Sequence, residues 1–243
     1  MSYVDVNGLS MYYQVVGDGP WLLLLHGGSG SMEYFSTAIP FFASQFRVIG
    51  IEQMGHGRTA DIPARPFHYH DMAEDTVEVI RQLGIESILV LGYSDGGIIG
   101  LDVAIHHPEL VTRLVVTGAN TSTDGYTEAN LEWVRTFGPD GVAVPEEYGR
   151  LSPDGRNHWP TLLERLKAMW LVEPSFTPEQ IQGVSAPTLI IIGDGDIVTP
   201  EHAVEMFRTI PHAQLCVVPH AGHGILPMET ILTFLQEPTT MAD

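Results

Sequence analysis

Gly92-Tyr93-Ser94-Asp95-Gly96-Gly97 joins two apolar segments of different length. Residues 88–91, before it, form a short apolar run that is typical of a strand buried on both faces. Residues 98–105, after it, are long enough for a mostly buried helix that His107-Pro108 would end. Gly-x-Ser-x-Gly at a strand-to-helix turn is the pattern of a nucleophile elbow, which lifts a serine hydroxyl clear of the sheet. Ser94 is therefore the candidate nucleophile, although the pentapeptide alone would fit an ordinary glycine-rich turn equally well.

The composition indicates a globular protein and excludes several classes of partner. A chain of 243 residues with 44% hydrophobic residues suits one domain with a sizeable core. A formal charge of −19, with Lys167 as the sole lysine, argues against nucleic acid and anionic membranes as partners. Cys216 is the only cysteine, so an intramolecular disulfide is impossible. The N-terminus shows no signal-peptide pattern, and we expect a soluble, cytoplasmic monomer or small homo-oligomer.

Apolar runs of strand length recur along the chain, and from the third run onward helix-like patterns separate them. Such alternation is typical of parallel strands joined by right-handed crossovers, with helices on both faces of an open sheet. The sequence thus predicts an α/β fold with a mostly parallel, twisted sheet. The predicted strands are 10–16, 21–25, 47–51, 88–91, 114–117, 188–192 and 215–218, and the predicted helices are 32–44, 69–83, 94–106, 200–209 and 228–236.

The alternation fails between the strand that ends near residue 117 and the one that begins near 188. This stretch is too long for a simple loop, and it contains helical apolar spacing after Pro160 and a capping box at Thr177. We predict a core formed by residues 1–121 and 185–243, with a small helical cap inserted at 122–184. Each aromatic residue of the cap is expected mainly to pack, but together they suggest an apolar substrate lining: Trp133, Phe137, Trp159 and Trp170.

Two later strands lead into loops that carry the partners a serine nucleophile needs. The run 188–192 continues into a loop with Asp194 and Asp196, and the run 215–218 continues into a loop with His220 and His223. A serine hydroxyl is a weak nucleophile without a base and a group that orients the base. Ligands of open α/β sheets bind beyond the carboxyl ends of the strands, where these loops and Ser94 all lie.

Four motifs in this order resemble those of the α/β-hydrolase family. They are His26-Gly27-Gly28-Ser29-Gly30, then Gly55-His56-Gly57-Arg58, the elbow, and the paired acid and histidine loops. The elbow is similar to that of the valacyclovir-hydrolase-like (biphenyl-hydrolase-like) small esterases, which cleave amino-acid esters. The chain departs from many relatives at Glu52-Gln53-Met54, where they carry an aspartate and an arginine before Gly-His-Gly.

The resemblance assigns roles within the two loops and the elbow. It favours Asp196 over Asp194 as the acid of a Gly-x-x-Asp turn, and His223 over His220 as the base that closes an Ala-Gly-His segment. The backbone amide after the nucleophile, that of Asp95, is expected to donate to the oxyanion. The resemblance places the second donor at Gly28, with Gly27 and Ser29 as alternatives.

The function expected from this pattern is serine-dependent hydrolysis of a carboxylic ester or lactone through an acyl-enzyme. C–C bond hydrolysis, perhydrolysis and a small-molecule receptor with little turnover are alternatives within the same fold. Ser29 and Asp95 are further candidates for substrate contact. The Asp95 carboxylate would either bind a cationic group of the substrate or only cap the helix after it. No cofactor and no metal are expected, since motifs such as His-Glu-x-x-His are absent from the sequence.

Overall fold

The computed structural model describes residues 2–237, which form one eight-stranded sheet in the order β1-β2-β4-β3-β5-β6-β7-β8. The first two strands run antiparallel to their neighbours, and β3 to β8 run parallel to one another. The predicted fold class is therefore confirmed. The strands are β1 Ser2–Val6, β2 Leu9–Val16, β3 Trp21–Leu25, β4 Arg47–Ile51, β5 Ile88–Tyr93, β6 Val111–Thr117, β7 Thr188–Gly193 and β8 Ala213–Val218.

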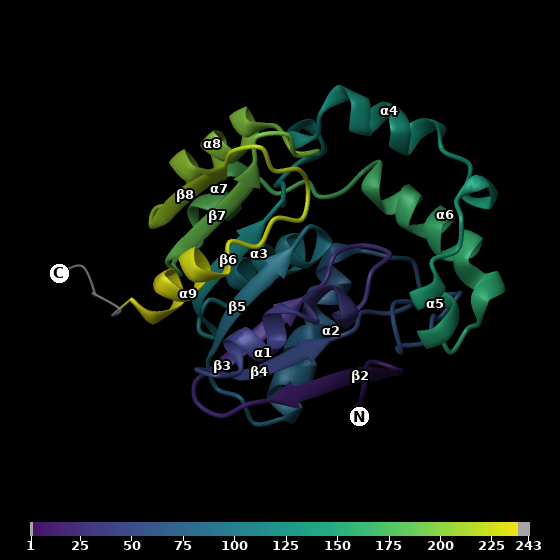
Figure 1. Cartoon of the computed structure of the whole chain (residues 1–243), viewed down its shortest axis with the longest axis horizontal. Coiled ribbons are helices and arrows are strands. Elements are labelled where there is room, and N and C mark those ends of the chain that lie inside the picture. Colours follow the sequence, from purple (N-terminus) through teal and green to yellow (C-terminus); the bar gives the residue numbers. More distant parts are fainter. Residues whose placement is uncertain (1, 238–243) are drawn as a thin grey trace.

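Helices cover both faces of the sheet, as Figure 1 shows. One face packs on α1, α9 and the 3-10 turn η1, and the other packs on α2, α3 and α8. The α-helices are α1 Ala38–Phe42, α2 Tyr69–Gln82, α3 Asp95–His106, α4 Glu128–Thr136, α5 Glu146–Leu151, α6 Trp159–Trp170, α7 Pro178–Gln182, α8 Pro200–Thr209 and α9 Met228–Gln236. The 3-10 turns are η1 Met32–Phe35, η2 Thr123–Gly125, η3 Pro139–Gly141 and η4 Arg156–His158.

The central strands are buried because their side chains meet a layer of helices on each side. Every residue of β7 is buried, and so are the last four residues of β3. Burying a leucine or isoleucine side chain contributes about 1.5–3 kcal/mol. These runs therefore fix the middle of the sheet, and the carboxyl ends of β3, β5, β6, β7 and β8 meet at one edge.

The segment between β6 and β7 holds α4, α5, α6 and α7. In Figure 1, α4 and α6 stand apart from the helices that flank the sheet, with α5 at the end of α6. The capping box predicted at Thr177 is present, with its side chain accepting from the Gln180 amide and the Gln180 side chain accepting from the Thr177 amide. Both predicted boundaries of the cap, at 121/122 and 184/185, fall outside the helices and named strands.

Two elements differ from the sequence prediction. The predicted helix 32–44 is instead the short turn η1 followed by α1. Pro40 explains the break, because a proline inside a long helix removes one hydrogen bond and clashes with the preceding turn. Strand β1, which pairs with β2, was not predicted. Across residues 2–237, none of the helices combines the length and the apolar character needed to cross a membrane.

Candidate active site

Ser94 lies on a tight turn between β5 and α3. Its backbone has φ 53° and ψ −123°, a conformation that side-chain-bearing residues rarely adopt. The flanking glycines make the turn possible, because a Cβ at Gly92 would lie 2.2 Å from the Gly96 carbonyl oxygen, and one at Gly96 would lie 2.1 Å from that of Leu25. The predicted strand-turn-helix context of the Gly-x-Ser-x-Gly motif is therefore present.

The loops after β7 and β8 bring an aspartate and a histidine to Ser94. His223 Nε2 lies 3.0 Å from Ser94 Oγ, and His223 Nδ1 lies 2.7 Å from Asp196 Oδ1. The Asp196 side chain is fully buried, and its Oδ1 also accepts a hydrogen bond from the Val198 amide. A serine, a base and an oriented acid are thus within hydrogen-bond reach of one another.

The two alternative partners lie elsewhere. Asp194 is exposed, and its Oδ1 accepts a hydrogen bond from the Ala221 amide at 3.2 Å. Backbone hydrogen bonds from the His220–Ala221 turn lower the pKa of the Asp194 carboxyl below its usual value. His220 is exposed and has φ 57°. Both residues therefore shape the histidine loop and do not reach Ser94.

The His223 loop is anchored by two core hydroxyls that the sequence did not single out. Tyr34 Oη donates to the Gly224 carbonyl at 2.6 Å, and Thr117 Oγ1 donates to the Ile225 carbonyl at 2.8 Å. The ring of Tyr34 stacks on that of Tyr93, beside the nucleophile, with 4.2 Å between the ring centroids. Burial raises the pKa of Tyr93 to about 12, so its hydroxyl stays neutral. These contacts fix the position of the imidazole.

The predicted oxyanion donors lie on the two loops that meet at Ser94. Over residues 2–237, neither the Gly28 amide nor the Asp95 amide has a hydrogen-bond acceptor within the chain. The Ser29 amide, one of the alternatives, donates to His56 Nε2 at 2.9 Å and is thus engaged. A Cβ at Gly28 would lie 2.3 Å from Asp95 Oδ2, so only glycine fits there.

Two buried histidines support the loop that carries Gly28. His26 Nδ1 lies 2.8 Å from the Gly27 carbonyl oxygen, and its Nε2 accepts from the Gln53 amide. His56 Nδ1 lies 2.8 Å from the Met54 carbonyl oxygen, and its Nε2 accepts from Ser29. Burial lowers the pKa of His26 to about 3 and that of His56 to about 4. Both rings are therefore neutral, with the proton on Nδ1.

Glu52, at the position where this sequence differs from many relatives, forms a buried ion pair in the same region. The Glu52 side chain is fully buried, and its Oε1 lies 2.6 Å from Arg58 Nη1 and accepts from the Met32 amide. Burial raises the pKa of this carboxyl, and the backbone hydrogen bond from Arg58 opposes the rise. Glu52 thus joins the 52–58 loop to η1 behind the Gly28 loop.

The Asp95 side chain connects the elbow to the cap. Its Oδ1 accepts from Tyr69 Oη and its Oδ2 accepts from Trp170 Nε1, each at 2.9 Å. Among residues 2–237, the hydrogen bonds of this carboxylate go to Tyr69 and Trp170 and not to the α3 backbone, although its charge still lies in the first turn of that helix. Burial raises the pKa of the carboxyl, while the hydrogen bonds from Trp170 and Tyr69 oppose the rise.

A cavity of about 150 Å³ opens in front of Ser94 and His223. Besides Ser94 and His223, four predicted site residues line it, namely Gly28, Asp95, Trp133 and Trp170. The cap adds residues that the sequence analysis missed: Tyr126, Asn130 and Val134, with Ile197 from the acid loop. The spacing of Asn130, Trp133 and Val134 on one face of α4 was the available signal.

Three predicted substrate contacts do not line this cavity. The Ser29 amide bonds to His56, and Phe137 stacks on the ring of Trp133. Trp159 is buried at the start of α6 against Tyr148. Ser29 therefore supports its loop through its backbone amide. Phe137 and Trp159 pack within the cap, away from Ser94.

The order of strands, the elbow and the three side chains at one sheet edge define a hydrolase of the α/β type. The family described as alpha/beta hydrolase fold matches residues 20–138 and 123–229, and the chain belongs to this family. The chain is a hydrolase.

Relatives extend the likeness over most of the chain. A putative carbamate hydrolase, RutD, of Agrobacterium fabrum is 23% identical over 88% of this chain and 92% of its own length. The serine hydrolase BPHL of Mus musculus is 28% identical over 91% of this chain and 79% of its own length. A solved serine hydrolase involved in carbazole degradation, the CarC enzyme, has a TM-score of 0.77 at 25% identity, covering 96% of this chain and 97% of that one.

Proposed function

We propose that this protein hydrolyses carboxylic esters through an acyl-enzyme formed on Ser94. The observation that carries the proposal is the pair of short contacts from His223, at 3.0 Å to Ser94 Oγ and 2.7 Å to Asp196 Oδ1, at the wall of a cavity. Such a chain of contacts turns a weak hydroxyl nucleophile into an effective one.

In the proposed mechanism, Ser94 Oγ attacks the ester carbonyl carbon while its proton moves to His223 Nε2. The carbonyl oxygen gains the negative charge, which the Gly28 and Asp95 amides stabilise. The tetrahedral intermediate then collapses and expels the alcohol, which takes the proton from His223. Water attacks the acyl-enzyme in the same way, with His223 as the base, and releases the carboxylic acid.

The cavity supports a short acyl group as the favoured substrate. Its volume of about 150 Å³ is well below the roughly 300–1,000 Å³ of pockets that hold drug-sized ligands. The cap residues Trp133 and Val134 supply apolar surface, and Asp95 is the carboxylate among the lining residues. We infer a small acyl group, and we keep the hypothesis that Asp95 contributes attraction for a cationic substituent close to the carbonyl.

Carbamates are a second candidate class, because the relative from Agrobacterium fabrum is named a putative carbamate hydrolase. The same attack of Ser94 on a carbamate carbonyl would give a carbamoyl-enzyme. Neither substrate class needs a group beyond those already described at the site.

The experiment is a steady-state comparison of wild type and Ser94→Ala on p-nitrophenyl esters of increasing acyl length and on an aryl carbamate. We expect sustained turnover with a preference for short acyl chains, and a loss of about 10⁶-fold in Ser94→Ala. Thr199→Ala, which removes the N-cap of α8 outside the cavity, is the control for general destabilisation.

Wild-type rates in a folded Ser94→Ala variant would refute the assignment of the nucleophile. A single turnover without a steady state on every substrate would favour the small-molecule receptor. A faster rate on the carbamate than on any ester would reassign the substrate class and leave the nucleophile in place.

A further inference from the structure

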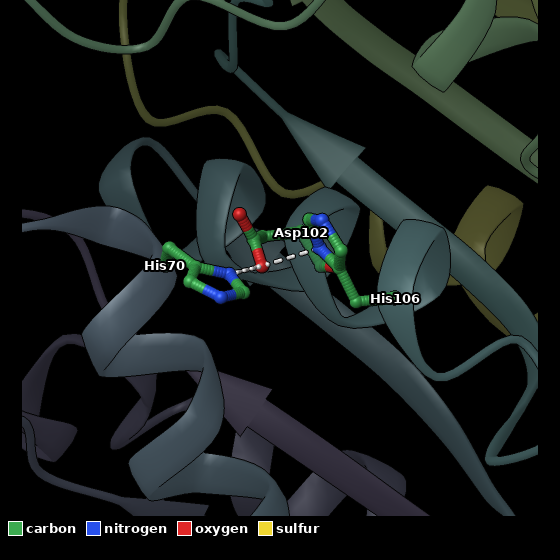
Figure 2. A group of neighbouring side chains, drawn as sticks. All are labelled: His70, Asp102 and His106. Atoms are coloured by element: carbon green, nitrogen blue, oxygen red, sulfur yellow. Dashed lines mark hydrogen bonds and ion pairs between the residues drawn. The ribbon is translucent and has the colours of Figure 1, made fainter.

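A second group of titratable side chains lies on the two helices behind the elbow, outside the cavity at Ser94. Figure 2 shows its members, His70 on α2 and Asp102 and His106 on α3. His70 Nδ1 and His106 Nδ1 each lie 2.9 Å from the same oxygen, Oδ1 of Asp102. The centroids of the two imidazole rings are 4.6 Å apart. One nitrogen or oxygen atom from each of the three residues lies within 4.8 Å of the corresponding atoms of the other two. The proposed ester hydrolysis uses none of the three.

Asp102 is a buried carboxylate without a permanent cation beside it. Its side chain is 4% exposed, and in the described part of the chain its ion-pair partners are the two histidines alone. A buried carboxylate is costly unless a positive charge or strong hydrogen bonds compensate it. Protonation of His70, whose pKa the hydrogen bond to Asp102 raises, is one way to supply that charge. A bound cation would supply it as well.

The histidines are placed so that a cation can reach them from solvent. The His70 side chain is 54% exposed and that of His106 is 34% exposed. All three residues line a cavity of about 250 Å³ that extends to Glu173 and Ser175 of the cap. Water in this cavity can fill the coordination positions that the protein leaves open.

We propose that His70, Asp102 and His106 bind a divalent transition-metal ion of the zinc type. Two imidazole nitrogens and one carboxylate oxygen are ligands that Zn²⁺ accepts, with a fourth position for water. Bonds of about 2.0–2.2 Å place neighbouring ligands of a tetrahedral site about 3.3 Å apart, so the observed 2.9 Å contacts need only a small opening.

The metal site would connect two helices that position the active site. His70 follows Tyr69, whose hydroxyl donates to Asp95, and Asp102 lies on the helix that begins at Asp95. A metal ion would fix the start of α2 against α3. No metal was expected from the sequence, because it contains no motif such as His-Glu-x-x-His. A spacing of 32 residues between His70 and Asp102 gives no such motif.

The test is a titration of Zn²⁺ into the chelator-treated full-length protein near neutral pH, followed by calorimetry and by competition with a chromogenic chelator. We expect one ion per chain in wild type. His70→Gln and His106→Gln should each weaken binding at least about 10-fold, because even the loss of a group that only orients a ligand costs about 10–100-fold in affinity. Zn²⁺ should also raise the thermal unfolding midpoint of wild type and not of these variants.

His107→Gln is the matched control. His107 follows His106 and also has carboxylate partners, Glu74 at 2.6 Å and Glu109 at 3.9 Å, but among residues 2–237 no second histidine joins this group. The affinity of the His107→Gln variant for Zn²⁺ should equal that of wild type. Absence of binding in wild type, or unchanged affinity in either His70→Gln or His106→Gln, would overturn the proposal. If His106→Gln does not fold, the Zn²⁺ affinity of His70→Gln, at a half-exposed position, tests the proposal alone.

Discussion

The Asp95 carboxylate has hydrogen-bond donors at both oxygens and still lines the cavity in front of Ser94. Tyr69 and Trp170 therefore fix its direction while leaving it close to a bound acyl group. The sequence left two roles open for this side chain, and its hydrogen bonds go to Tyr69 and Trp170 and not to the α3 backbone. The hypothesis that this carboxylate attracts a cationic substrate group concerns substrate selectivity.

Asp95→Asn should lower kcat/KM for an alanyl or valyl ester relative to the matching ester without the amine. A hydrogen bond to a charged group contributes about 1.5–3 kcal/mol, so the ratio should fall by roughly 10-fold to 100-fold. Tyr69→Phe is the control, since it removes one donor and keeps the carboxylate. An unchanged ratio in Asp95→Asn would eliminate the hypothesis of a cationic substrate group.

Asp196 and Asp194 are two residues apart in sequence but differ in what they contact. Asp196→Asn should reduce kcat by about 10⁴-fold, because an amide no longer holds the His223 imidazole in the required tautomer. Asp194→Asn should have a much smaller effect, since Asp194 bonds to the Ala221 amide at the surface. Steady-state kinetics of both variants on one ester is the measurement, and equal losses would contradict the assignment.

His56 should make the stability of the protein depend on pH. Burial lowers its pKa from 6.5 to about 4 in the folded state. Between these two values the unfolded chain binds a proton that the folded chain does not, so the free energy of unfolding falls as the pH falls.

Wild type should therefore lose stability relative to His56→Gln between pH 6.5 and about 4, by on the order of 3 kcal/mol. Urea unfolding of both proteins across this pH range is the measurement. His212→Gln, at an exposed position, should follow wild type. A constant difference between wild type and His56→Gln would show that His56 is not held neutral.

At the scale of elements, the sequence predicted most strands of the sheet because their apolar runs are buried on both faces. It failed where local pattern and tertiary contacts disagree. Residues 32–44 have helical spacing, but Pro40, in the first turn of α1, prevents a helix from continuing back through Ser36. Strand β1 has mostly exposed side chains, and its pairing with β2 stabilises it through backbone hydrogen bonds that leave little sequence signal.

The cap helix α6 should depend on its contact with the elbow. Trp170→Phe removes the indole N–H that donates to Asp95 at 2.9 Å but keeps an aromatic ring against Gly28. Losing a hydrogen bond to a charged group should lower the free energy of unfolding by about 1.5–3 kcal/mol.

Activity on all esters should fall together, because the carboxylate that loses its donor lies against the Gly28 loop. Trp21→Phe is the control, since Trp21 begins β3, at the end of the strand opposite the Ser94 edge, where its ring contacts Arg47. Urea unfolding and kcat/KM for two esters are the measurements. Equal stability in Trp170→Phe and wild type would show that the contact does not hold the cap.

At the scale of the whole molecule, the candidate site is built where several distant segments meet at one edge of the sheet. The sequence placed Ser94, an acid and a histidine at that edge because each follows a strand whose carboxyl end must lie there. The resemblance to the α/β hydrolases then favoured Asp196 over Asp194 and His223 over His220. It could not locate Tyr69 or Tyr126, because their positions depend on how α2 and the cap pack on the core.

Trapping the intermediate on Ser94 tests the central claim most directly. Wild type is mixed with a short-chain p-nitrophenyl ester and quenched in acid during turnover, and its peptides are analysed by mass spectrometry. We predict a burst of p-nitrophenol, one acyl group on the peptide that contains Ser94, and no acylated peptide in Ser94→Ala. An acyl group on a different residue, or hydrolysis by Ser94→Ala at the wild-type rate, would contradict the account.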